Sequence, residues 1–158
     1  MKYILVLLFF VNFSNAQSDI KDIRKIFILS TDSYLKCTQL NEMTSHKVTI
    51  SPIYHSYNIV SKILESKYLI NPVKKVKVFK ENTKLLDSLL VSHPKILEIR
   101  FLRYSIQLNA PKILAYTNFV KEDYEFIYAF CKYFYEGHVK FPHLDFKEFT
   151  SNINKIIV

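Results

Sequence analysis

Apolar residues recur every three or four positions along most of the chain, which is the spacing of one face of an α-helix. The clearest stripe runs through Val76, Phe79, Thr83, Leu86 and Leu90. Polar or proline-containing breaks separate the stripes. These patterns predict an all-α fold of about six helices in antiparallel hairpins, at residues 18–43, 52–69, 73–92, 94–108, 119–136 and 145–157.

Residues that favour caps and turns mark the ends of these helices. Ser30 to Ser33 interrupt the first apolar stripe, so residues 18–43 form one helix or two. Pro94 fits the first turn of the helix that it opens, and Gly137 is placed to stop the aromatic-rich helix before it. A capping box is expected before the last helix, formed by Asp145 and Glu148.

The stretch 94–108 is apolar on two sides, so it should pack between neighbouring helices. A further face of the same helix carries Arg100, Arg103 and Gln107. Two guanidinium groups there could bind a carboxylate or phosphate of a partner. Alternatively, the arginines pair with acids or cap helix-end carbonyls inside the bundle. The candidate partner-binding set is Arg100, Arg103, Tyr104, Gln107 and Asn109, with Tyr116 as a further neighbour.

Two resemblances involve this part of the chain. The stretch 85–111, LLDSLLVSHPKILEIRFLRYSIQLNAP, resembles a tetratricopeptide-type unit at Leu86, Leu89 and Pro94, although Asn82 stands where that repeat has alanine. The box from Glu98 to Pro111 is similar to a family of small exported helical proteins of flavobacteria-like organisms. The similarity covers about residues 20–130, and it implies a helical fold and an exported protein without assigned catalytic residues.

The first 16 residues have the three parts of a cleavable export signal in order. Lys2 supplies the positive charge, residues 4–11 are an unbroken apolar run, and Ser14 and Ala16 are small. The alternatives are a buried strand or an uncleaved anchor. We expect cleavage before Gln17, a periplasmic or secreted protein, and one helical domain over residues 17–158. No later apolar run reaches the length of about 20 residues that spans a bilayer.

Composition limits the partners of the expected 142-residue mature chain. Loss of Lys2 lowers the formal charge from +8 to +7. This excess favours acidic partners or an anionic envelope surface, while export removes nucleic acid as the usual target. A lysine run either contacts such a surface or is a solvated helix face, and it comprises Lys74, Lys75, Lys77 and Lys80.

The sequence lacks the motifs of several kinds of catalytic or binding site. The chain has one glycine, so it cannot build a phosphate-binding loop or a nucleophile elbow. His138 and His143 lie five residues apart near Glu136, but zinc needs three or four convergent ligands. We therefore predict no metal site and no cofactor; the other histidines are His46, His55 and His93.

Cys37 and Cys131 leave two alternatives open in an oxidising compartment. They form one disulfide between the first and last thirds of the fold, or they remain buried thiols, which their apolar helical surroundings favour.

The sequence favours a non-enzymatic helical module that binds a protein or peptide partner in the cell envelope. The alternative is an envelope hydrolase whose catalytic residues are scattered through the chain. A third hypothesis is that the lysine run binds weakly to an anionic envelope surface. The oligomeric state is left open.

Overall fold

The computed structural model describes residues 19–135, and this part of the chain is all-α, as predicted. A first helix covers residues 19–30. It is followed by α2 (Tyr34–Ser45), α3 (Pro52–Ser66), α4 (Pro72–Ser92), α5 (Leu97–Asn109), the short 3-10 helix η1 (Lys112–Leu114) and α6 (Val120–Tyr135). Within residues 19–135 there is no strand, and no helix is long and apolar enough to cross a membrane.

The chain divides into two compact units, Met1–Leu85 and Leu86–Val158. The expectation of one domain over residues 17–158 stays a prediction. The boundary falls inside α4, where an unbroken amphipathic helix gives no linker-like composition to mark it. Each unit is described by itself below.

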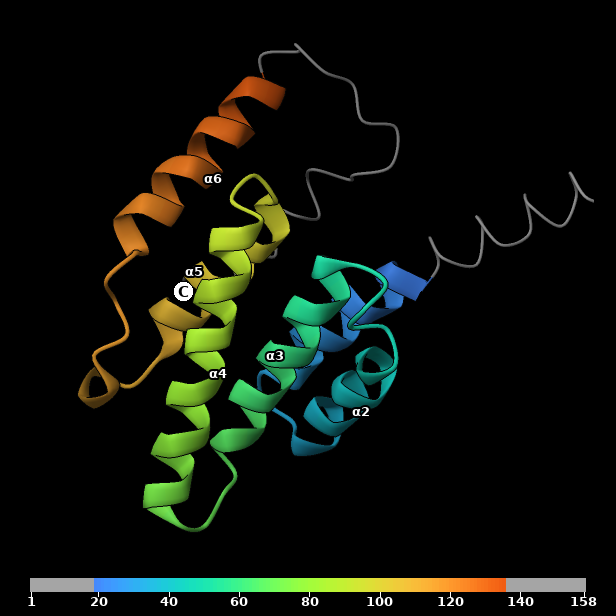
Figure 1. Cartoon of the computed structure of the whole chain (residues 1–158), viewed down its shortest axis with the longest axis vertical. Coiled ribbons are helices and arrows are strands. Elements are labelled where there is room, and N and C mark those ends of the chain that lie inside the picture. Colours follow the sequence, from blue (N-terminus) through green and yellow to red (C-terminus); the bar gives the residue numbers. More distant parts are fainter. Residues whose placement is uncertain (1–18, 136–158) are drawn as a thin grey trace, which may run out of the picture. The chain divides into compact units, whose positions relative to one another are not determined.

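In the first unit, α2 and α3 form an antiparallel pair (Figure 1). Tyr34 and Tyr68 meet edge to face at one end, with ring centroids 5.4 Å apart. Toward the other end, the Asn58 side chain donates to Asn41 at 2.9 Å. The helix over residues 19–30 joins this pair through Phe27, whose ring meets that of Tyr57 at 5.7 Å.

The break at residues 31–33 is real, so the chain forms two helices where one or two were expected. Ser33 is the N-cap of α2, and its hydroxyl accepts a hydrogen bond from the Lys36 backbone N–H. Ser51 caps α3 in the same way, with Pro52 in the first turn. In both cases the side chain satisfies a backbone donor that has no partner within the helix.

In the second unit, α5 packs against α6. The expectation that Pro94 opens α5 is wrong. The backbone N–H of Ile96 donates to the His93 carbonyl and closes a turn, and the Pro94 carbonyl accepts from the Arg100 side chain instead of from a helical amide. The helix therefore begins at Leu97.

The apolar pattern of α5 was also misread at one position. Residues 94–108 were expected to pack between neighbouring helices, but Leu108 is exposed. The buried face is centred on Ile99, Arg103 and Ile106, and Leu108 points away from it because each residue turns the helix by about 100°. Arg103 and Gln107 belong to this buried face, although both are polar.

Some expectations fall outside the described residues. These are the leader at residues 1–16, the helix stop at Gly137, the capping box at Asp145 and Glu148 with its last helix, and the histidines His138 and His143.

Candidate functional site

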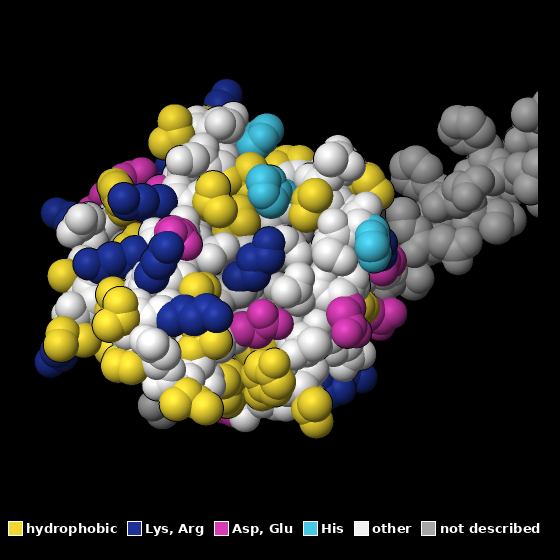
Figure 2. All heavy atoms as spheres, turned by 60° about the horizontal axis from the view of Figure 1, so that its bottom comes forward, with side chains coloured by type: hydrophobic (Ala, Val, Ile, Leu, Met, Phe, Trp, Pro, Cys, Tyr) yellow, Lys and Arg dark blue, Asp and Glu magenta, His cyan; other side chains and the backbone are white. Residues whose placement is uncertain are grey.

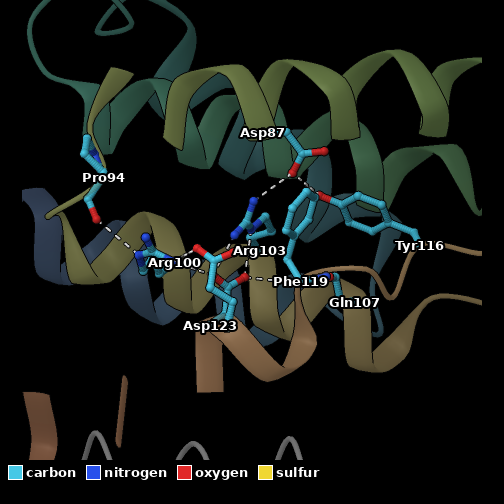
Figure 3. Close-up of polar contacts among 9 residues, drawn as sticks. Asp87, Pro94, Arg100, Arg103, Gln107, Tyr116, Phe119 and Asp123 are labelled. Atoms are coloured by element: carbon cyan, nitrogen blue, oxygen red, sulfur yellow. Dashed lines mark hydrogen bonds and ion pairs between the residues drawn. The ribbon is translucent and has the colours of Figure 1, made fainter. Parts of the chain in front are cut away.

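A cluster of charged side chains lies buried where α5 meets α6 (Figure 3). Its centre is Asp123, in the first turn of α6, which is fully buried. Arg103 of α5 is 4% exposed and Gln107 of α5 is 2% exposed. Burying such groups is unfavourable unless each finds a partner. Each of these buried side chains therefore needs a hydrogen-bond or ion-pair partner within the cluster.

The Asp123 carboxylate accepts four side-chain hydrogen bonds. Arg103 binds it as a fork, with Nε donating to Oδ2 at 2.7 Å and Nη2 donating to Oδ1 at 2.7 Å. Arg100 Nη1 adds a bond to Oδ1 at 3.0 Å, and Gln107 Nε2 adds one to Oδ2 at 3.0 Å. Paired, charged hydrogen bonds of this kind are the strongest in proteins.

A second carboxylate reaches the cluster from the end of α4. Asp87 Oδ1 accepts from Arg103 Nη1 at 3.3 Å and from the Tyr116 hydroxyl at 2.8 Å. Tyr116 comes from the loop after η1, directly after Ala115, whose backbone is left-handed at φ 49°. The bond to Asp87 thus ties this loop to α4.

Arg100 occupies the outer edge of the cluster. Its Nη1 bonds the exposed Glu122 at 2.8 Å as well as Asp123, and its Nε donates to the Pro94 carbonyl at 3.1 Å. The guanidinium lies over the Phe126 ring, 4.4 Å from the ring centroid. The hydrogen bonds to acids and to a carbonyl match the internal alternative that the sequence left open.

The electrostatics follow from these contacts. Burial by itself lowers the pKa of Arg103, but the bonds to Asp123 and Asp87 outweigh it, so its pKa is raised. Burial, followed by the charge of Asp87, raises the pKa of Tyr116 strongly. The hydrogen bond from Arg100 lowers the pKa of Glu122. At neutral pH these shifts keep the Arg103 guanidinium charged, the Glu122 carboxylate ionised and the Tyr116 phenol protonated.

The predicted binding residues separate into two groups. Arg100, Arg103 and Gln107 meet around Asp123, where Arg103 and Gln107 are buried and bonded internally. Asn109 donates back to the Ser105 carbonyl of its own helix. Tyr104 is partly exposed and lies outside the cluster.

Four members of the cluster were missed in the sequence: Asp87, Phe119, Glu122 and Asp123. Asp123 did leave a signal, because it lies four residues after Phe119 and four before Ile127, in the middle of an apolar stripe. Phe119 contributes twice, since its backbone N–H donates to Gln107 Oε1 at 2.9 Å and its ring lies 4.2 Å from the Arg103 guanidinium. Asp87 carries no such signal.

A row of tyrosines crosses the outer surface beside the cluster. Tyr124 and Tyr128 of α6 are 52% and 58% exposed, and their rings stack with centroids 6.0 Å apart. Tyr104 of α5 continues the row at 6.3 Å from Tyr124. We call these three residues the tyrosine row.

The remaining candidates are dispersed. Cys37 and Cys131 are both free thiols; Cys37 is buried, and its Sγ donates to the Ser30 carbonyl at 3.0 Å. Burial raises the pKa of both thiols. His46 is exposed, whereas His55 and His93 are partly exposed. Within the described part of the chain, no three His, Cys, Asp or Glu side chains gather as metal ligands.

Comparisons with protein-family models, with curated proteins and with solved structures found no match.

Proposed function

We propose that the chain is a non-catalytic helical module that acts outside the cytoplasm and binds a protein or peptide partner through the tyrosine row. The carrying observation is that Tyr124 and Tyr128 are stacked and more than half exposed. Tyrosine is enriched in binding interfaces because its ring supplies a large contact area while only two torsions have to be fixed. Tyr104 extends this contact area onto a second helix.

The charged cluster supports the proposal by its position. Asp123 is buried and directly precedes Tyr124, so the bonds that fix Asp123 also fix where Tyr124 emerges. A binding surface that is already held in place loses less conformational freedom when a partner arrives. The arginines therefore contribute by holding α6, and the tyrosines make the contact.

The polar groups inside the unit favour a binding role over a reactive one. Across the described residues, no buried side-chain nitrogen or oxygen lacks a hydrogen-bond partner. Both Asp123 oxygens are engaged by cations and an amide. A carboxylate has about four acceptor sites, and hydrogen bonds from two guanidinium groups and one amide fill those of Asp123, so it offers little to a substrate.

The test is site-specific photocrosslinking in living cells. A photoreactive phenylalanine analogue at Tyr128 is expected to give a discrete protein adduct, recovered from the envelope or the medium. Tyr124→Ser should reduce the yield about tenfold or more, since a hot-spot residue contributes about 2 kcal/mol. The same analogue at Tyr34, an equally exposed tyrosine of the first unit, is the matched control and should give no such adduct.

Equal adducts at Tyr34 and Tyr128 would contradict the proposal, because contact would then be non-specific. A cytoplasmic adduct would contradict the proposed compartment. An adduct at Tyr128 that Tyr124→Ser leaves unchanged would separate the partner from the tyrosine row.

A further inference from the structure

A second surface lies on the first half of α4, far along the chain from the tyrosine row. Between residues 73 and 85 the sequence has five lysines and one glutamate, a net charge of +4. Lys77, Lys80 and Lys84 follow Val73 at intervals of three and four residues, so they share one face of the helix. The opposite side carries the buried Phe79, Asn82 and Leu86. We call Lys74, Lys77, Lys80 and Lys84 the lysine face.

Apolar side chains project beside the lysine face at the start of α4. Ile70, in the turn before the helix, is fully exposed at 101%, and Val73 in its first turn is 76% exposed. Val76 is partly exposed on the next turn. Figure 2, which brings the α3–α4 turn forward, shows lysine and arginine side chains gathered together with hydrophobic side chains beside them. An exposed isoleucine and valine next to four lysines is an amphipathic surface.

Helix stability does not explain this arrangement. The N-terminus of a helix carries a partial positive charge and favours acids, yet the first turn of α4 contains no acidic residue. Lys74 and Lys75 instead add positive charge there. The ion pair between Lys77 and Glu81 is long at 3.9 Å and well exposed, so it contributes little. The start of α4 therefore carries a concentrated positive charge with no acid in its first turn.

We propose that this end of α4 binds the surface of an anionic lipid bilayer. The lysine face would contact the phosphate-bearing headgroups, while Ile70 and Val73 would enter the boundary between headgroups and acyl chains. The lysines alone would fit any polyanion. The exposed apolar residues favour a bilayer, because a soluble polyanion offers them nothing to be buried in. This surface is independent of the partner proposed for the tyrosine row.

The experiment is vesicle co-sedimentation of the full chain and its variants. Wild type is expected to bind vesicles containing phosphatidylglycerol more tightly than vesicles of phosphatidylcholine alone, and binding should weaken as salt rises above about 0.1 M. The triple variant Lys74→Gln, Lys77→Gln, Lys80→Gln should bind the anionic vesicles about a hundredfold more weakly, at about fivefold for each lysine.

The matched control neutralises the same number of exposed lysines elsewhere: Lys25→Gln, Lys95→Gln, Lys112→Gln. It should keep most of the wild-type affinity. Because every variant keeps residues 1–18, a difference between them reports on the substituted positions. Equal losses in the two triple variants would overturn the proposal, since only net charge would then matter.

A second pair of measurements separates a bilayer from a soluble polyanion. Ile70→Ser with Val73→Ser should weaken vesicle binding about tenfold or more, and should leave binding to soluble polyphosphate unchanged. Both residues are exposed, so the fold should survive, which circular dichroism checks. If this variant binds anionic vesicles as tightly as wild type, the bilayer is the wrong occupant.

Discussion

The two units differ in how their buried polar side chains find hydrogen-bond or ion-pair partners. In the first unit, the buried polar side chains between α2 and α3 are neutral: Asn58 donates to Asn41 at 2.9 Å and to Thr44 at 3.3 Å. The acid Glu65, which hydrogen-bonds Asn41, is only half-buried. In the second, the joint between α5 and α6 is ionic, with Asp123 bound by two arginines. A neutral group can be satisfied within its own helix, whereas a buried charge needs a partner from another element.

The hydroxyls of the first unit illustrate local satisfaction. Ser61 and Ser66 of α3 are buried, and each donates to the carbonyl three residues earlier. Thr44 of α2 donates to the Leu40 carbonyl at 2.7 Å. Such bonds survive if the neighbouring helix shifts. The ion pairs between α5 and α6 need side chains from both helices. We therefore expect substitutions there to lower the free energy of unfolding far more.

The largest expected effect comes from Asp123→Ala. The change leaves Arg103 buried without its main partner, and breaking a buried pair on one side costs about 3–5 kcal/mol. Urea denaturation at neutral pH measures the loss in free energy of unfolding. Glu122→Gln is the control, because it pairs with Arg100 at the exposed edge and should change stability by at most about 1 kcal/mol. Equal losses in the two variants would show that burial of the pair is irrelevant.

An intermediate effect is expected for Tyr116 at alkaline pH. Its pKa is raised by burial and by Asp87, so the phenol stays protonated in the folded state while the unfolded chain ionises near pH 10. The unfolded state then binds fewer protons, and stability falls as pH rises. The contribution is complete below about pH 10 and is lost above it, at up to about 1.4 kcal/mol per pH unit.

Unfolding of wild type and Tyr116→Phe between about pH 8 and pH 11 checks this sign. The excess alkaline slope should be present in wild type and absent from the variant. Identical slopes would mean that Tyr116 ionises equally in both states.

The smallest effect is expected for Asn58→Ala in the neutral joint. It removes two hydrogen bonds, one of them long, and should lower the free energy of unfolding by about 1–2 kcal/mol. Thr44 keeps its bond to Leu40, so only part of the network is lost. Chemical denaturation at pH 6 and at pH 9 should give the same loss. A loss as large as that of Asp123→Ala would remove the contrast between the two joints.

Much of the fold could be predicted because its determinants are local. The break at Ser30 to Ser33, the start of α3 at Pro52 and the break at Asn71-Pro72, where α4 begins, depend on neighbouring backbone groups. Apolar spacing also gave the buried stripe of α4 through Phe79, Leu86 and Leu90. The residues at the helix ends and the apolar spacing together were enough to predict that these segments are α-helices.

The cluster could be predicted only in part, because pairing is a tertiary property. The sequence put Arg100, Arg103 and Gln107 on one face, but Asp123 lies 20 residues after Arg103. The residues next to a buried arginine in the sequence do not show which acid it will pair with. Pro94 failed for a related reason, since the Arg100 side chain takes the carbonyl that a helix beginning at Pro94 would have used.

The fork between Arg103 and Asp123 sets the rotational phase of α6. A helix that turned about its axis by one residue, about 100°, would carry Asp123 out of reach of both arginines. Tyr124 and Tyr128 are locked to that phase by the covalent chain. One buried carboxylate therefore fixes the direction in which α6 presents its exposed side.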